Sequence, residues 1–356
     1  MAEDVSGERI ARQGLAVRAE VGVRAAVALA AGIQAQDAPA SRLGVRARDR
    51  AATDADVVRA IVEDRTVVRS WLMRATIHLV DSADVRWMTA LLGPMIRRRF
   101  GGIRWPELGL STDVLARAEA LAPEVLAPGP LTRHELSAAL AERGVEVDPR
   151  GQAPTHLALF LSSLGLVCRG PDRGAQVTFT LLDSWLPEVL EGPRGDEALA
   201  ELARRYFRAF SPATPADFTA WSGLPSARAI ALIRDELTAG RIGGQAGYRL
   251  GAVEPERGLR LLPAFDNYLV GYRNRDLIID RDRRAEVYVG GIIRPTVLLD
   301  GHVVGRWRLL RSGRSATVEV WPFAACSTAM RRLIEQEVDD VGRFLNMPVA
   351  ATFRGD

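Results

Sequence analysis

Apolar side chains recur at helical spacing through the middle of the chain and outline one supersecondary unit. The segment Thr132–Glu135 is a capping box, which predicts the start of a helix with apolar residues facing inward. After a turn at Gly144, a second helix is expected from Thr155 to Gly165. Two short alternating segments at 166–169 and 176–181 then predict a pair of strands. Helix, turn, helix and a two-stranded wing are typical of a winged helix.

The same order of elements recurs after this segment. Thr214–Asp217 is an N-cap that has proline at the first helical position, and Ser226 is expected to cap the next helix. A glycine-rich hairpin is expected over 240–253, and a helix carrying Tyr206 and Phe210 would cover the unit. The pattern therefore predicts another winged helix here.

The first third of the chain repeats this order less regularly. A long helix is expected from about Arg9 towards Ile33, and a second helix is expected over 54–64. Extended segments follow over 67–73 and 76–80. Because the three copies are unequally spaced, the sequence favours three tandem winged helices over a solenoid.

From Leu259 onward the period of the apolar residues changes from helical to alternating, which predicts a β-rich end. Strands are expected at 277–279, 292–299, 303–310 and 317–321. Asp300-Gly301 is a strong two-residue hairpin signal, and a last helix over 324–344 closes the chain. The predicted fold class is α+β, with three winged-helix units and a β-rich C-terminal region that occupy residues 1–120, 121–195, 196–258 and 259–356.

The composition of the 356 residues narrows the possible chemistry. The chain contains no lysine, so all 47 basic side chains are arginine, and P-loop, pyridoxal and lysine-nucleophile mechanisms are excluded. No apolar run approaches the roughly 20 residues that a bilayer crossing needs. The acidic start at Glu3, Asp4 and Glu8 does not fit a secretory signal, so a cytoplasmic protein without a membrane partner is expected.

Metal and disulfide chemistry also lack their patterns in the sequence. Cys168 and Cys326 lie far apart without a CxxC spacing, and the four histidines are scattered without an HxxxH spacing. No GxSxG motif is present. We therefore expect no metal, no other cofactor and no cysteine or serine nucleophile.

The net charge of +3 is modest, but the arginines are clustered. Guanidinium groups suit phosphate oxygens, although a solvated surface explains most single arginines. The two clusters consist of Arg42, Arg46, Arg48, Arg50 and Arg97–Arg99 in the first third, and Arg273, Arg275, Arg281, Arg283 and Arg284 near the end.

Two glutamines stand out where the first long helix is expected to end. Residues two apart point to nearly opposite sides of a helix but to the same side of an extended segment. Because Gly32 and Pro39 are expected to end the helix, Gln34 and Gln36 are predicted to project together. A polar helix exit without chemistry is the alternative.

Three segments carry a resemblance to a known family. “GIQAQDAPASRLGVRAR”, “RATIHLV” and “RLLPAFDNYLVGYRNRD” together resemble the AlkZ/YcaQ-type winged-helix DNA glycosylases of bacteria, and the similarity covers nearly the whole chain. In that family a Gln-x-Gln motif lies in the active site, which carries over to Gln34 and Gln36. The resemblance implies a C-shaped DNA-binding cleft and a monomer that acts on double-stranded DNA.

The resemblance also implies a substrate. Family members excise N7-alkylated guanines, including bulky natural-product adducts and in some cases interstrand crosslinks, and members from antibiotic producers give self-resistance. Two neutral amides cannot act as a general base, so they suit a leaving group that is already activated, such as cationic N7-alkylguanine. We therefore expect a monofunctional glycosylase.

The three resembling segments are expected to converge on one cleft. Arg74, His78, Arg273 and Arg275 would contact DNA there, while a carboxylate at Asp266 could help stabilise the sugar cation. A purely packing role for the segment around Asp266 is the alternative.

The Asp300-Gly301 hairpin is a further candidate for DNA contact. With His302 at its tip and Arg306 on the return strand, it could probe the minor groove opposite the lesion. An ordinary surface turn is the alternative.

Two other classes of protein fit the tandem winged helices. A non-catalytic DNA-binding regulator would carry polar readers on helices such as 54–64 or 155–164, and would not need a paired amide at a helix exit. A protein-binding scaffold predicts no salt-dependent affinity for DNA.

Overall fold

The computed structural model of the protein describes residues 4–354, which form two compact units. The terminal unit comprises the chain up to Val58 together with the chain from Leu202 onward, and the middle unit is Arg59–Glu201. The mixed α+β class is confirmed, and the terminal unit is built from both ends of the chain. The four regions expected from the sequence stay a prediction. Within the described residues, no helix has the length and apolar character required to span a membrane.

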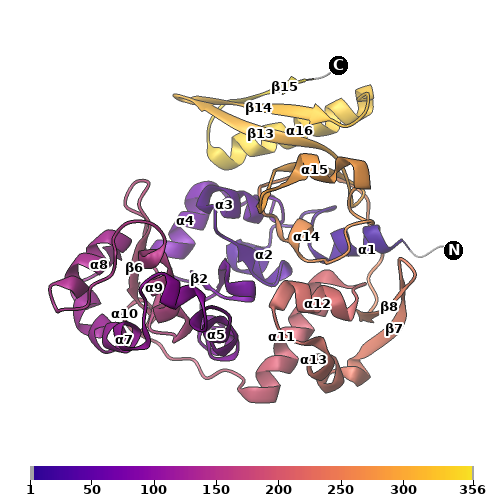
Figure 1. Ribbon diagram of the computed structural model, residues 1–356. Helices are drawn as coiled ribbons and strands as arrows, with labels where there is room; N and C mark the ends of the chain where they lie inside the picture. Colours follow the sequence, from indigo (N-terminus) through magenta and orange to yellow (C-terminus); the bar gives the residue numbers. More distant parts are fainter. Residues whose placement is uncertain (1–3, 355–356) are drawn as a thin grey trace. The chain divides into compact units, whose positions relative to one another are not determined.

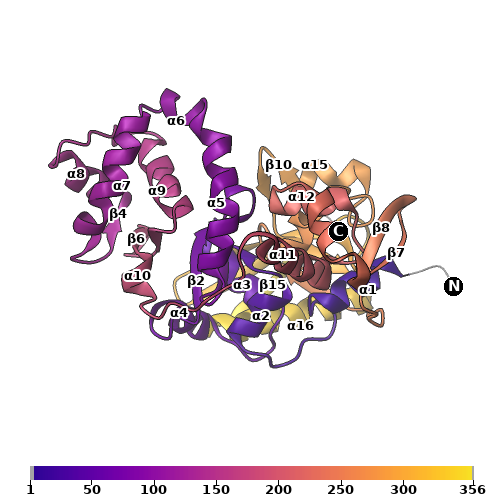
Figure 2. The same cartoon turned by 90° about the horizontal axis from the view of Figure 1, so that it is seen from below.

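The middle unit is built on antiparallel strands that neighbour one another in the order β3-β2-β5-β6-β4. These strands are β2 (Val67–Trp71), β3 (Ile77–Asp81), β4 (Leu131–Thr132), β5 (Val167–Arg169) and β6 (Thr178–Leu181). The helices of this unit are η1 (Met73–Ala75), α5 (Val85–Gly101), α6 (Arg104–Glu107), α7 (Thr112–Leu126), α8 (Arg133–Ala141), α9 (Ala153–Ser163) and α10 (Leu182–Trp185). Helices α7, α8 and α9 pack together (Figures 1 and 2).

Local signals in the middle unit produce the elements that they predict. The Thr132 hydroxyl accepts a hydrogen bond from Glu135 N at 3.3 Å, and the Glu135 carboxylate accepts one from Thr132 N at 2.7 Å. Together they satisfy two backbone donors at the start of α8. Gly165 has a positive φ of 78°, which ends α9 and allows β5 to begin. The predicted order of helix, helix and two strands is present here.

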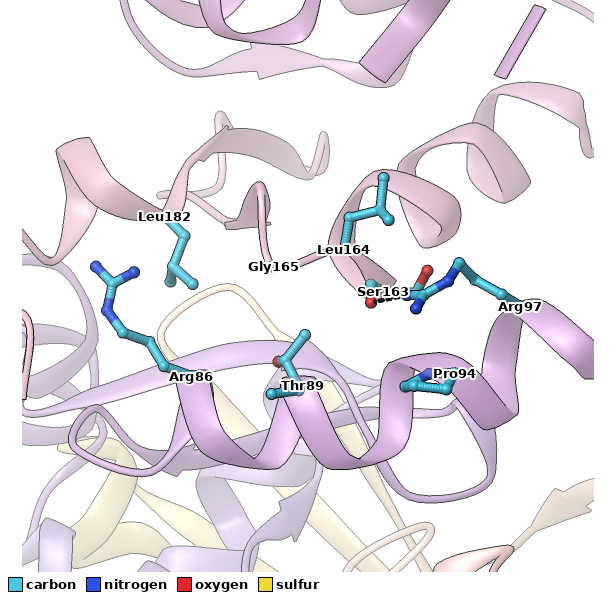
Figure 3. Close-up of a pocket in the computed structure, with 9 residues that line it drawn as sticks. Arg86, Thr89, Pro94, Arg97, Ser163, Leu164, Gly165 and Leu182 are labelled. Carbon is cyan, nitrogen blue, oxygen red and sulfur yellow. Dashed lines mark hydrogen bonds between the residues drawn. The ribbon is translucent and has the colours of Figure 1, made fainter. Parts of the chain in front are cut away.

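A pocket of about 290 Å³ lies in the middle unit (Figure 3). Its wall includes α5 and the turn after α9, where Arg97 Nη1 donates to the Ser163 carbonyl oxygen at 2.6 Å. Arg86 lines the other side and is held by Asp183. Arg97 is the one member of the arginine clusters among these lining residues, and neither Gln34 nor Gln36 is among them, so the candidate active site lies elsewhere.

The amino-terminal part of the terminal unit differs from the prediction of one long helix. It contains α1 (Val5–Arg12), α2 (Val23–Leu29), β1 (Ile33–Gln34), α3 (Ala38–Arg46) and the start of α4 (Asp54–Val62). The backbone turns at Gly14, where φ is 62°, so α1 stops. Asp49 then accepts hydrogen bonds at 2.7 Å from the N–H groups of Val21 and Gly22. Long-range contacts therefore override the helical periodicity of this segment.

The carboxy-terminal part of this unit contains a sheet with strand order β15-β14-β13-β12-β9, and α16 packs against β9 and β15 (Figure 1). The strands are β9 (Leu259–Leu262), β12 (Thr296–Leu299), β13 (His302–Ser312), β14 (Ser315–Pro322) and β15 (Val349–Phe353), and the helix is α16 (Thr328–Leu345). The sequence did not predict β15, which pairs in parallel with β14. The expected strand at 277–279 is wrong, because these residues form a turn.

The remaining elements lie in this unit, except that the first of them, α11, begins in the middle unit and enters this one at Leu202. They are α11 (Gly195–Phe210), α12 (Pro215–Ser222), α13 (Ser226–Leu232), η2 (Arg234–Glu236), β7 (Leu237–Ile242), β8 (Gln245–Leu250), α14 (Asn267–Val270), η3 (Arg281–Arg283), α15 (Arg284–Val287), β10 (Tyr288–Val289) and β11 (Ile292–Ile293). Thr214 caps α12, as predicted, and it also forms a capping box with Asp217. Ser226 does not cap α13, since Pro225 occupies that position without a side-chain bond.

A cluster of buried charges ties α3 and β9 to α16. Glu337 of α16 accepts from Arg46 Nη1 at 3.0 Å and from the backbone N–H of Leu261 at 3.1 Å, and it also contacts Arg260. Burial acts to raise the pKa of Glu337, but the charges of Arg46, Arg260 and Arg18 hold that pKa below its ordinary value. The carboxylate is therefore ionised and neutralises buried guanidinium groups.

Glu337→Gln is expected to lower the free energy of unfolding by about 3–5 kcal/mol, because it removes the carboxylate that pairs with buried Arg260 and leaves Arg46 with Asp340 alone. Urea denaturation would measure this loss. Glu335→Gln, at an exposed position of the same helix, is the control and should stay within about 0.5 kcal/mol of the wild type. Equal stability of the two variants would contradict a role for the charge cluster in holding α16.

Candidate active site

The two glutamines lie in a short extended segment between α2 and α3. Ala31 and Gly32 have positive φ angles of 50° and 92°, which turn the chain sharply after α2. Asp37 then begins α3, because its carboxylate accepts a hydrogen bond from Ala40 N at 2.9 Å. We call residues 30–37 the glutamine loop. The predicted end of the helix before Gln34 is confirmed, although that helix is short.

The side chains of the two glutamines meet. Gln34 Nε2 donates a hydrogen bond to Gln36 Oε1 at 2.8 Å, so both side chains project together, as the spacing predicted. Gln34 is only 5% exposed, whereas Gln36 is exposed. The pair thus has one anchored amide and one that reaches solvent. Such a pair offers neutral donors and acceptors and no group that takes a proton near neutral pH.

Asn267 clamps the backbone of the glutamine loop. Its Oδ1 accepts a hydrogen bond from Gln34 N at 2.8 Å, and its Nδ2 donates to the carbonyl oxygens of Ala30, at 3.0 Å, and Gly32. Asn267 is 1% exposed and begins α14. The first and third of the segments that carry the family resemblance therefore come together here. The convergence of these two segments is confirmed.

The neighbouring Asp266 does not face a cleft. Both of its carboxylate oxygens accept hydrogen bonds from Arg48, at 2.8 and 2.9 Å, and both side chains are fully buried. One of these oxygens also accepts from Tyr268 N at 2.9 Å. The expectation that Asp266 stabilises the sugar cation is wrong, because the carboxylate is enclosed and its charge is compensated by Arg48.

The sequence assigns no role to Asn267, and it places Arg48 only in a cluster of arginines that a solvated surface would explain. A signal was available for Asn267, since two adjacent polar residues interrupt the apolar segment “LLPAFDNYLVGY”. Buried polar groups in such a segment need hydrogen-bond partners, so these residues are expected to bond to other elements of the fold.

Arg74 and His78 belong to the middle unit, and their approach to the glutamine pair stays a prediction. Arg74 lies in η1 with a positive φ of 55°. His78 is fully buried on β3, where burial and the nearby charge of Arg74 lower its pKa to about 3. A buried neutral imidazole offers no cation to a phosphate, so a direct DNA contact by His78 does not agree with this placement.

Arg273 and Arg275 follow α14 in the terminal unit. Arg273 is exposed, and its backbone N–H donates to Asp217 at 2.8 Å. The guanidinium of Arg275 lies over the ring of Tyr288, 3.9 Å from its centroid. Arg273 thus offers an accessible cation for a DNA phosphate, while Arg275 packs on an aromatic ring. Their contact with DNA stays a prediction.

The Asp300-Gly301 turn joins β12 and β13 as expected, but it does not project. The carbonyl oxygen of Gly301 accepts a hydrogen bond from the Tyr268 hydroxyl at 2.8 Å, and a Cβ at Gly301 would lie 2.8 Å from Ser6. His302 lies 3.3 Å from Asp280, and the guanidinium of Arg306 stacks on Trp321 at 4.4 Å. The proposed probe of the minor groove is therefore wrong, since Gly301 is buried against α1 and α14.

Asp266→Asn is expected to lower the midpoint of thermal unfolding, because Arg48 would remain buried without its counter-charge, at a cost of about 3–5 kcal/mol. A direct role on the sugar would instead reduce the reaction rate and leave the unfolding midpoint unchanged. Differential scanning calorimetry beside a rate measurement separates these outcomes. Asp280→Asn, an exposed carboxylate, is the control.

Within the described residues, no group of three or more histidine, cysteine or carboxylate side chains is placed to hold a metal ion.

A family model described as “DNA glycosylase AlkZ-like” matches residues 27–344. The “Interstrand DNA cross-link repair glycosylase” of Streptomyces sahachiroi is 30% identical over 360 residues, which cover 94% of each protein. The solved structure of the Streptomyces sahachiroi DNA glycosylase AlkZ matches with a TM-score of 0.84 and 26% identity over 98% of each chain. This protein therefore belongs to the AlkZ-like family of DNA glycosylases.

Proposed function

We propose that this DNA glycosylase is monofunctional and hydrolyses the N-glycosidic bond of N7-alkylated guanine in double-stranded DNA. The proposed substrates include bulky natural-product adducts and interstrand crosslinks, so that the enzyme repairs DNA and gives its host self-resistance to a genotoxic antibiotic. The meeting of the Gln34 and Gln36 amides in a loop with an exposed edge carries this proposal. The relative from Streptomyces sahachiroi, which is named for interstrand crosslink repair, supports the crosslink part.

The chemistry of the lesion suits a pair of neutral amides. Alkylation at N7 gives guanine a positive charge, and the electrons of the breaking C1′–N9 bond neutralise that charge as the base leaves. The oxygen of a water molecule forms the new bond to C1′, and its surplus proton passes to solvent. The enzyme then needs to place this water and stabilise a sugar with oxocarbenium character. It does not need to protonate the base.

The two glutamines have different roles in this reaction. Gln36, which is exposed, can hold the attacking water and present its amide dipole to the sugar. Gln34 is buried and hydrogen-bonded to Gln36, so it fixes the direction of the exposed amide. Neutral alkylated bases lack the activated leaving group and should therefore be poor substrates.

Contacts to the DNA backbone are proposed for the winged-helix units and for exposed arginines such as Arg273, which would line a C-shaped cleft in a cytoplasmic monomer.

A non-catalytic regulator is the second candidate. It would read bases with polar side chains of a helix such as α9, but most of α9 is buried, including Leu157, Phe160 and Leu161. A helix so enclosed has few side chains left to enter a groove, which favours the enzyme.

The double variant Gln34→Ala/Gln36→Ala is expected to abolish excision, with a rate loss of more than about 10³-fold, and to keep DNA affinity within about threefold. Placing the water contributes to the transition state and hardly to binding. Single-turnover release of abasic sites from a duplex with a defined N7-alkylguanine measures the rate. Gln336→Ala, at an exposed position on α16, is the control. Wild-type activity of the double variant would remove the proposal.

The reaction is expected to stop at the abasic site. An imine with the sugar needs an amine, and the chain has no lysine, so only the α-amino terminus remains. Incubation with damaged duplex and sodium borohydride should leave no covalent protein–DNA species, while a lysine-dependent lyase traps one under the same conditions. Trapping of this protein would show lyase chemistry and contradict the monofunctional assignment.

A further inference from the structure

The side chain of Asn267 forms hydrogen bonds with three backbone groups of the glutamine loop. The carbonyl oxygens of Ala30 and Gly32 lie just beyond the end of α2, where a helix leaves acceptors without intrahelical partners. The N–H of Gln34 lies two residues further along. Asn267 donates to both carbonyl oxygens and accepts from this N–H. A primary amide supplies two N–H donors and an acceptor oxygen at once, whereas a hydroxyl has one donor and an ionised carboxylate has none.

Asn267 is itself held in place by a residue that follows α3. It follows Asp266, whose carboxylate is bound bidentately by Arg48, two residues beyond α3. Arg48 also donates to the carbonyl oxygen of Gly44 and to the side chain of Gln13, each at 3.0 Å. The dipeptide Asp266-Asn267 thus binds the chain both before and after the glutamine pair. The start of the loop cannot shift relative to α14 without breaking the contacts of Asn267.

We propose that Asn267 is the positioning residue of the glutamine pair. It sets the backbone of Gln34, and through Gln34 the direction of the Gln36 amide, without contacting the substrate itself. This inference rests on the proposed function, in which the two amides place the attacking water. Misplacement of a catalytic group by about 1 Å costs about 10²-fold in rate. Loss of Asn267 therefore acts on the rate of excision and spares the affinity for DNA.

Asn267→Asp tests the need for the amide donors. An ionised carboxylate at this position has no proton for the carbonyl oxygens of Ala30 and Gly32, and it repels them. A protonated carboxyl restores one donor and one acceptor. The adjacent Asp266 carboxylate is paired with Arg48, so these two charges neutralise each other. Burial favours the protonated form, so the rate relative to wild type is expected to rise as the pH is lowered from about 8 to about 6.

The experiment uses the full-length protein and a duplex carrying a defined N7-alkylguanine. Asn267→Ala is expected to lower the single-turnover rate by about 10²-fold, with the dissociation constant for DNA within about threefold of wild type. Amide hydrogen exchange at Gln34 should become faster, because its N–H loses its acceptor. Ser327→Ala, which removes the side-chain cap of α16, is the stability control and should lower the unfolding midpoint without slowing excision.

Three results would overturn the proposal. The first is a wild-type excision rate for folded Asn267→Ala, and the second is unchanged amide exchange at Gln34 in that variant. The third is an equal loss of excision rate in Ser327→Ala, when each variant is assayed at the same number of degrees below its own unfolding midpoint. If Asn267→Ala does not fold, Asn267→Asp decides, and a pH-independent rate relative to wild type overturns the proposal.

The double glutamine variant separates this inference from the proposed function. If that variant is inactive and Asn267→Ala is fully active, only the positioning role fails. If the double variant keeps full activity, the proposed function fails and the positioning role fails with it.

Discussion

One buried ion pair, between Arg48 and Asp266, joins residues 218 positions apart in the sequence and determines where the glutamine loop lies. Two charges removed from water are stable together only when their geometry is good and their remaining groups are bonded. Here the pair is bidentate, and other hydrogen bonds of the two groups reach Gly44, Gln13 and Tyr268, while Nε of Arg48 is buried without a hydrogen-bond partner among the described residues. A shift of either segment would leave a buried charge without its partner. The loop is therefore confined to one position.

This confinement matters because the proposed reaction relies on dipoles and not on proton transfer. A flexible amide reorients as charge develops on the sugar, whereas a fixed amide presents its dipole before the reaction begins. The ion pair beneath the loop also carries no net charge. Under the proposed function, a cationic base can approach such a site without repulsion from Arg48. An arginine at the same place without Asp266 would oppose binding of N7-alkylguanine.

Elements with local signals could be predicted from the sequence, and elements that depend on distant contacts could not. The capping boxes at Thr132 and Thr214 and the turn at Asp300 are formed by neighbouring residues, and the structure has them where the sequence predicts. The long first helix fails at Gly14, where the chain turns towards partners more than 25 residues away, such as Asp49. Strand β15 pairs in parallel, which no local pattern encodes.

The candidate site divides in the same way. The spacing of Gln34 and Gln36 was sufficient to predict that they project together, since this depends only on extended backbone between them. Residue type alone suggests that Asp266 acts on the sugar and that Arg48 lies on a solvated or phosphate-binding surface. Only the fold shows that the two charges compensate each other in the interior. The sequence alone thus does not show whether charged residues in a functional segment contact the substrate or form an ion pair with each other.

Because the chain contains no lysine, its buried ion pairs are formed by arginine. Two of these arginines hold α3, the helix that follows the glutamine loop. Arg46 in the last turn of α3 binds Glu337 and Asp340, and Arg48 just beyond it binds Asp266. A guanidinium stays charged when buried and can bond a carboxylate through two parallel N–H groups, which an ammonium cannot do. Successive arginines therefore hold the same helix to two different partners. Because α3 begins directly after Gln36 and Asp37, fixing its far end by charge fixes the direction in which the neutral pair enters solvent.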